Sequence, residues 1–214
     1  MRLISRWQNS AGERVRIALN LKGISYTYVP SGSLEPGELK RLNPQGLLPA
    51  LDLGGQIVAQ SAAILDYIEE TYPEPSLLPH DPTLRAQARA FAAHIASEMH
   101  SITVQRVRQF LRTDMNADDA AIGRWVIHWL TLGFKALEET LARRGFHSPF
   151  CFGDNPGWAE LHLVPQMSNG RRLGCDLSNY PLLLSVEERC TALEAFRLAR
   201  PEAQPDFPDL ESRA

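Results

Sequence analysis

The sequence predicts two domains, a small α/β domain with the element order βαβ-ββα and an all-helical domain after it. In the first 79 residues, short strand-like runs alternate with amphipathic helix patterns. The stretch YPEPSLLPHDP at 72–82 holds four prolines, which is typical of a linker. Beyond it, apolar residues recur three and four positions apart, as on one face of a helix. We therefore expect domains at 1–79 and 82–214.

Each element of the first domain follows from a local pattern. Gly23 can end the first helix, and Gly54 with Gly55 can turn a hairpin. Pro49 interrupts this hairpin, and because proline donates no ladder hydrogen bond, it predicts an edge position or a cis peptide bond. The expected elements are a strand at 2–7, a helix at 11–22, a strand at 25–29, a hairpin at 47–60 and a helix at 61–73 with Ser61 at its N-cap.

The second domain is predicted to contain long helices. One apolar stripe runs from Leu84 to Ile102, and another from Ile122 to Ala136. The first stripe fits either the core of the domain or a contact with a second copy of the chain. Further helices are expected at 158–170 and 183–199, and the proline-rich tail after them is expected to be extended.

Composition narrows the possible partners. The chain has 214 residues, of which 44% are hydrophobic and 22% charged, as in ordinary globular proteins. A net charge of -3 gives no reason to expect nucleic acid or an anionic membrane as a partner. The N-terminus has no signal-peptide pattern, and no run approaches the roughly 18 apolar residues of a membrane span. We expect no metal site.

Cysteine usage bears on both compartment and chemistry. The three cysteines, Cys151, Cys175 and Cys190, form no CxxC pair, and their odd number suits a reducing cytoplasm. The first 150 residues contain no cysteine. A thiol reaction centred in the first domain would therefore need a sulfur from a bound molecule.

The junction between the first strand and the first helix, QNSAG at 8–12, is a candidate site. A helix start leaves backbone N–H groups unpaired and attracts anions. Ser10 and Glu13 fit the capping box S-x-x-E, and Asn9 is the alternative cap, which would leave Ser10 to face a ligand. The junction is therefore either a cap that stabilises the helix by about 1 kcal/mol or a place where a thiolate is held.

The hairpin and the helix after it add two further signals. Leu48, before Pro49, could offer its backbone groups to an extended peptide ligand. Gln60 and Ser61 stand at a helix start, where a carboxylate can meet backbone N–H groups.

The sequence resembles zeta-class glutathione transferases, which include maleylacetoacetate and maleylpyruvate isomerases. The resemblance runs from residue 14 to 205 and is carried by RVRIALNLKGISY, LNPQGLLPAL, AQSAAILDYIEETYP, LVPQMSNGRR and DLSNYP. It implies a thioredoxin-like first domain in the glutathione-transferase fold, a homodimer, and glutathione bound mainly by the first domain.

The resemblance also assigns roles to single residues that bind glutathione. It implies that Leu48, before a cis Pro49, pairs with the cysteinyl backbone of glutathione. Gln60 and Ser61 would hold the γ-glutamyl carboxylate. His100 falls where some relatives contact the glycyl end.

The junction departs from the pattern of the family. Asn9 stands at the first serine position, which commonly contacts the thiolate, and Ser10 matches the second serine. We keep both as candidates, with Ser10 first. Gln8 stands where relatives that isomerise small dicarboxylic keto acids often carry arginine. An uncharged amide cannot form the two charge-assisted hydrogen bonds that arginine makes to a carboxylate. This difference favours a partly aromatic acid over a small diacid as substrate.

The substrate side would hold anionic groups. Arg172 matches an arginine that lines this side in relatives. Arg106, Arg108 and Arg112 lie on one predicted helix, and positions two apart diverge by about 200°, so they cannot all face the site.

The expected function is glutathione-dependent cis–trans isomerisation of an unsaturated keto acid, of the maleylacetoacetate or maleylpyruvate type, in the breakdown of aromatic compounds. One alternative is a transferase that conjugates, dehalogenates or cleaves another electrophilic substrate. The second is a non-catalytic binding protein of the same fold.

Overall fold

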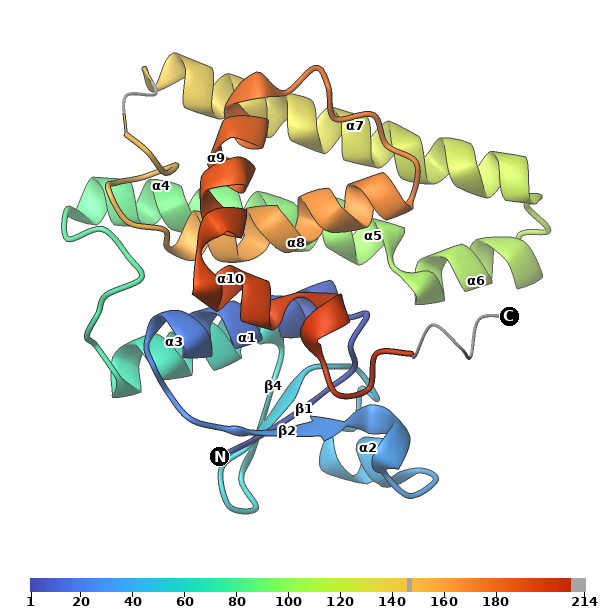
Figure 1. The fold of residues 1–214 in the computed structure, drawn as a ribbon. Helices are drawn as coiled ribbons and strands as arrows, with labels where there is room; N and C mark the ends of the chain where they lie inside the picture. The colour runs from blue at the N-terminus through green and yellow to red at the C-terminus, as the bar shows by residue number, and fades with distance from the viewer. Residues whose placement is uncertain (146–147, 209–214) are drawn as a thin grey trace. The chain divides into compact units, whose positions relative to one another are not determined.

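The computed structural model describes residues 1–145 and 148–208. They form two compact units (Figure 1). Among the described residues, the N-terminal unit consists of Met1–Leu77 together with residues 191–208, and the helical unit consists of Leu78–Cys190. The structure thus packs residues 191–208 into the N-terminal unit, whereas the sequence assigned them to the helical domain.

The N-terminal unit has the predicted βαβ-ββα order. Its sheet has the strand order β2-β1-β3-β4, in which β1 and β2 are parallel and the other neighbours are antiparallel. The elements are β1 (Arg2–Ser5), α1 (Ser10–Leu21), β2 (Thr27–Pro30), the short turn η1 (Ser31–Ser33), α2 (Glu38–Leu42), β3 (Ala50–Asp52), β4 (Ile57–Ala59) and α3 (Ser61–Thr71).

The core of this unit lies where α1 and α3 meet the sheet. One cluster of fully buried side chains comes from α1, α3 and the sheet and consists of Leu3, Val15, Leu19, Leu51, Ile64 and Ile68. The helix residues are spaced four apart, so each helix presents one apolar side to the strands. Burying one such side chain contributes about 1.5–3 kcal/mol, and this packing fixes where each helix begins relative to the sheet.

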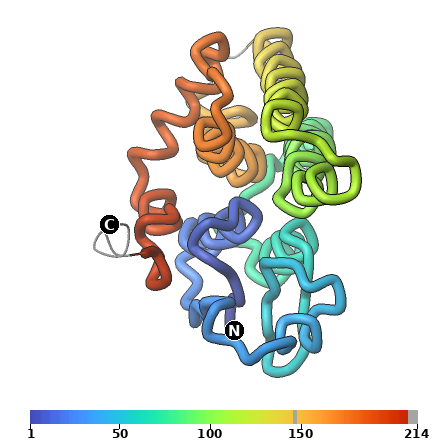
Figure 2. Tube along the Cα trace, turned by 90° about the vertical axis from the view of Figure 1, so that its right-hand side faces the viewer, coloured from blue at the N-terminus to red at the C-terminus, as the bar shows by residue number. Residues whose placement is uncertain are grey.

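The C-terminal segment packs on α1. The expected helix at 183–199 is two helices, α9 (Pro181–Ala192) and α10 (Glu194–Ala199), because Leu193 has an extended backbone between them. A short turn, η3 (Pro201–Ala203), follows. Figures 1 and 2 show α10 in red beside α1 in blue, where the Asn20 side chain donates to the Ala195 carbonyl at 2.9 Å. Over residues 201–208 the prediction of an extended tail was wrong, because η3 and the turn bond from the Phe207 N–H to the Gln204 carbonyl fold this segment back, and residues 209–214 of the predicted tail lie outside the described residues.

The helical unit contains an interrupted first helix. Its helices are α4 (Pro82–Ala93), the π-helical η2 (His94–His100), α5 (Ser101–Thr103), α6 (Gln105–Thr113), α7 (Asp119–Arg143), α8 (Trp158–Arg172) and most of α9. Val104 is extended, so Arg106 and Arg108 lie on a separate short helix rather than on the long helix that we expected.

The apolar stripe from Leu84 is core. Phe91, Ile95 and Met99 are buried, and the ring of Phe91 packs edge-on against Phe152 at 5.8 Å. These side chains of the stripe are therefore buried within the helical unit, and the stripe gives no reason to expect a contact with a second copy of the chain. None of the helices in residues 1–145 and 148–208 is long and apolar enough to cross a membrane.

Candidate active site

Three of the predicted segments meet at one end of the sheet. The strand register aligns Ile4 of β1 with Ala50 of β3, and Ala50 with Ala59 of β4. The chain leaves β1 just after Ile4, enters β3 just before Ala50 and leaves β4 just after Ala59. The junction at 8–12, the Leu48–Pro49 pair and the start of α3 therefore share this end of the sheet.

Asn9, not Ser10, caps α1. Asn9 has an extended backbone, its side-chain oxygen accepts from the Gly12 N–H, and its carbonyl accepts from the Glu13 N–H at 2.8 Å. Ser10 is the first helical residue, and the Glu13 side chain is buried. The capping box predicted from Ser10 and Glu13 was wrong, and the alternative cap was correct, because burial of Glu13 and the close approach of Gly12 to Ser5 start the helix one residue after Asn9.

The tight packing under this cap requires a glycine. A Cβ added at Gly12 would lie 2.1 Å from the Ser5 hydroxyl oxygen and 3.1 Å from the Asn9 side-chain oxygen. The missing side chain lets the first turn of α1 approach the end of β1. It also leaves the Gly12 N–H aligned with the cap.

The cap leaves the other end of the Asn9 amide available. Asn9 Oδ1 is taken by the helix, and in the described part of the chain Asn9 Nδ2 makes no hydrogen bond. An asparagine side chain can accept and donate at the same time. The start of α1 therefore combines a fixed amide donor with the positive end of the helix dipole.

The Leu48–Pro49 peptide bond is cis, one of the two forms expected. The loop before it is held by the buried Asn43, whose side chain donates to the Leu47 carbonyl at 2.8 Å. Among residues 1–145 and 148–208, no hydrogen bond uses the backbone N–H or C=O of Leu48. This backbone is thus open to an extended partner chain.

Gln60 adopts an unusual conformation at the start of α3. Its φ is 72°, a region that non-glycine residues rarely occupy, and such strain costs about 1–3 kcal/mol. Gln60 occupies the N-cap position of α3, but its side chain makes no capping hydrogen bond. Ser61, which the sequence predicted as the N-cap, is instead the first helical residue. The Gln60 amide donates to Gln45 Oε1 at 2.6 Å. Because no side chain caps them, the first backbone N–H groups of α3 remain able to bind an anion.

Arg14 adds a buried cation at this helix start. Its Nη1 donates to the Ser61 hydroxyl oxygen at 3.3 Å, and its Nε and Nη2 have no partner in the described part of the chain. Burial lowers the pKa of Arg14 to about 10, and the charge of Glu13 opposes this shift, so the guanidinium stays charged at neutral pH. Sequence reasoning missed Arg14 and Gln45. The signal for Arg14 was an arginine inside an apolar helix pattern.

The remaining candidates lie in the helical unit. Arg108 is half-buried, its Nε has no partner among the described residues, and burial followed by the charge of Arg112 lowers its pKa. Arg106 is exposed. Arg172 is exposed at the end of α8 and donates to Asn169 Oδ1, and His100 is the half-buried last residue of η2.

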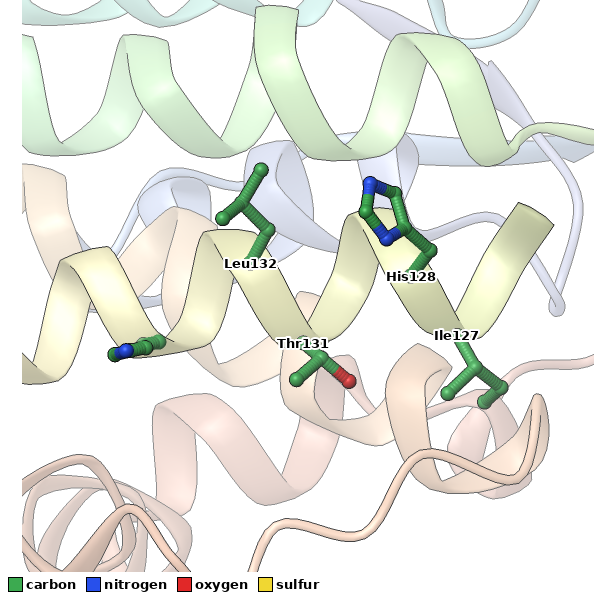
Figure 3. Close-up of a pocket in the computed structure, with 5 residues that line it drawn as sticks. Ile127, His128, Thr131 and Leu132 are labelled. Carbon is green, nitrogen blue, oxygen red and sulfur yellow. The ribbon is translucent and has the colours of Figure 1, made fainter. Parts of the chain in front are cut away.

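A separate surface pocket lies on α7 (Figure 3). Its lining comes from that one helix and consists of Ile127, His128, Thr131, Leu132 and Lys135. It contains none of the predicted residues and carries no buried polar cluster.

Comparison with known proteins identifies the family. The model of the glutathione S-transferase N-terminal domain matches residues 9–76. A maleylpyruvate isomerase of Ralstonia sp. is 44% identical over 210 residues, which cover 96% of this chain and 99% of the relative. The chain belongs to the zeta class of glutathione transferases. A maleylacetoacetate isomerase of Pseudomonas aeruginosa, 38% identical over 97% of this chain and 99% of its own, agrees.

Solved structures support this assignment to the zeta class. The holo structure of a maleylpyruvate isomerase, described as a bacterial zeta-class glutathione transferase, has a TM-score of 0.91 at 42% identity and covers 97% of this chain and 100% of that one. A maleylacetoacetate isomerase of Methylobacterium extorquens AM1, solved with malonate and glutathione, has a TM-score of 0.90 at 35% identity, covering 98% and 100%. The predicted fold and the prediction of an enzyme of this class are confirmed.

Proposed function

We propose that this zeta-class transferase is a glutathione-dependent cis–trans isomerase of an unsaturated keto acid, of the maleylpyruvate or maleylacetoacetate type, in the breakdown of aromatic compounds. The observation that carries the proposal is the convergence, at one end of the sheet, of an amide-capped helix start, an open cis-prolyl backbone and a second helix start with a buried cation. The full-length similarity to enzymes named for this reaction supports it.

The residues at this end of the sheet fit glutathione. The open backbone of Leu48 suits the peptide backbone of the cysteinyl residue. The start of α3, with Gln60, Ser61 and the charge of Arg14, suits the γ-glutamyl carboxylate. When bound, glutathione supplies the thiolate that adds reversibly to the conjugated double bond.

The start of α1 would keep this thiol ionised. We assign the donor role to Asn9, because the cap fixes its Oδ1 on the helix and leaves its Nδ2 without a hydrogen bond among the described residues. Ser10, the first candidate from the sequence, becomes the second. The dipole of α1 favours the negative sulfur in the same place.

The substrate is an acid, and the helical unit offers cations for it. Arg108 is the best candidate, because its guanidinium is partly buried without a partner among the described residues. Arg112 is already paired with Asp119, and Arg106 is exposed. Arg172 and His100 keep the roles that the resemblance implies, the substrate side and the glycyl end of glutathione.

Gln8 favours a second candidate function. Its amide carries no charge beside the helix start, so a substrate with a neutral or aromatic group there would fit better than a small diacid. Conjugation of such an electrophile by the same thiolate is the alternative reaction. It differs from isomerisation because glutathione is consumed.

Assembly and compartment complete the proposal. We expect a homodimer, on the grounds of family membership alone, and a monomeric mass at micromolar concentration in sedimentation would contradict it. The three cysteines are free and buried, as in proteins of a reducing cytoplasm, where we expect this enzyme.

The experiment that tests the function is a turnover assay on maleylpyruvate with glutathione present, coupled to a count of free thiol. Isomerisation predicts product without loss of thiol. Loss of one thiol per product would establish conjugation instead. If glutathione binds but maleylpyruvate is not turned over and the thiol pKa is not lowered, the protein only binds glutathione.

A further inference from the structure

The carboxylate of Asp206, near the end of the described chain, holds the segment that leads into the α1 cap. Asp206 Oδ2 accepts a hydrogen bond from the Trp7 backbone N–H at 3.1 Å. Its Oδ1 accepts from the Tyr28 hydroxyl on β2 at 2.8 Å. One side chain thus connects the C-terminal segment to both β2 and the residue two positions before Asn9.

Trp7 is fixed at two further points. Its carbonyl accepts from Arg16 Nη2 at 3.4 Å, and Arg16 is itself buried, with Nε bonded to the Ala199 carbonyl at 2.9 Å. The Trp7 ring packs edge-on against Phe207, with centroids 5.1 Å apart. The N–H, the carbonyl and the ring of Trp7 therefore each have an anchor, and all three anchors involve the C-terminal segment directly or through Arg16.

These anchors lie where the backbone has no support of its own. Strand β1 ends at Ser5 and Asn9 already caps helix α1, so residues 6–8 take part in neither ladder nor helix. A donor that stabilises developing or fixed charge must be held to within about half an ångström to act fully. The position of the Asn9 amide therefore depends on the cap of α1 on one side and on what holds Trp7 on the other.

We propose that Asp206 and Phe207 are positioning residues for thiol activation: the C-terminal segment clamps Trp7 and thereby sets the Asn9 amide toward the bound thiol. This inference rests on the proposed function of the α1 start. It gives the end of the chain a role in the chemistry, and that role is distinct from the packing of α10 on α1.

The test compares two variants that alter the same carboxylate contact differently. Asp206→Ala removes both hydrogen bonds, whereas Tyr28→Phe removes only the tyrosine side and keeps the bond to Trp7. Asp176→Asn, an exposed carboxylate of the helical unit, controls for the change in charge. For each variant, the pKa of bound glutathione is read from thiolate absorbance against pH, its affinity from calorimetry, and the protection of the Trp7 amide from hydrogen exchange.

We expect Asp206→Ala to raise the thiol pKa by about one unit and to leave the affinity for glutathione within about threefold, because the carboxylate site at α3 is untouched. The Trp7 amide should exchange faster in this variant alone. Tyr28→Phe and Asp176→Asn should leave the thiol pKa unchanged.

An unchanged thiol pKa in Asp206→Ala, with faster exchange at Trp7, would overturn the clamp and leave a structural anchor only. If Asp206→Ala does not fold, Phe207→Leu replaces it, and an unchanged pKa in this variant would also overturn the proposal. Failure of the proposed function is separate, since it would appear in the unaltered protein as consumed thiol, absent turnover or absent glutathione binding.

Discussion

Arg14 of α1 donates to the hydroxyl of Ser61, the first residue of α3, across 3.3 Å. Both residues are buried, so the contact connects a cation to a helix N-terminus in a region of low dielectric. The two positive features reinforce one another at the point where a carboxylate is expected. This contact makes the two side chains a unit whose members can be tested together.

Ser61→Ala should weaken glutathione binding by roughly tenfold or more, because a hydrogen bond to a charged group contributes about 1.5–3 kcal/mol. Titration calorimetry measures the change. Unchanged affinity would exclude Ser61 from the carboxylate site.

Arg14→Met should also weaken binding, since methionine keeps much of the volume but removes the buried charge. In a double-mutant cycle with Ser61→Ala, the combined loss should be smaller than the sum of the single losses, because both variants disrupt one unit. Strictly additive losses would mean that Arg14 and Ser61 contribute to binding independently, and unchanged affinity in Arg14→Met would exclude Arg14 from the carboxylate site.

Asn9→Ala should raise the pKa of bound glutathione and lower turnover more than Ser10→Ala does. The physical reason is that the alanine removes both the α1 cap and the amide donor. Cys151→Ser serves as the control, because burial raises the pKa of that thiol and keeps it inert. A larger pKa change in Ser10→Ala would return the role to Ser10.

Glu13 should make the stability of the protein fall as pH rises through neutrality. Burial raises the pKa of this carboxyl from 4.5 to about 7, with Arg16 opposing the shift, so the folded protein binds a proton that the unfolded chain has released. The free energy of unfolding should therefore decrease between pH 4.5 and about 7, by about 3 kcal/mol at roughly 1.4 kcal/mol per unit of pKa.

Glu13→Gln should flatten this dependence, because glutamine has no proton to lose. Urea unfolding at a series of pH values compares the two proteins. An identical slope in both would mean that another group titrates in this range.

Gln8→Arg should improve kcat/KM for maleylpyruvate or maleylacetoacetate by tenfold or more, because a bidentate pair with a substrate carboxylate contributes about 2–3 kcal/mol. High activity of the unaltered protein on either diacid, with no gain in the variant, would show that Gln8 does not set specificity.

The parts of the fold that local patterns control could be predicted from the sequence. The βαβ-ββα order follows from alternation and helix spacing, and the exclusion of proline from a ladder limited Pro49 to an edge position or a cis bond, of which the structure has the cis bond. The parts that depend on packing could not. Nothing local distinguishes Asn9 from Ser10 as the cap, since the choice depends on burial of Glu13 and on the approach of Gly12 to Ser5.

Long-range contacts explain the other differences. The end of the chain reads as extended because it is rich in proline, yet Asp206 and Phe207 bind residues about 200 positions earlier. Arg14 reads as a surface charge of α1, and only the position of Ser61 reveals it as part of a site. No single-residue pattern carries either contact.

The most direct test of the account measures maleylpyruvate turnover by the unaltered protein with glutathione present in substoichiometric amount, while free thiol is counted. The account predicts many molecules of the trans product per glutathione and a constant thiol concentration. Product that stops when glutathione is exhausted, with one thiol lost for each molecule formed, would contradict it.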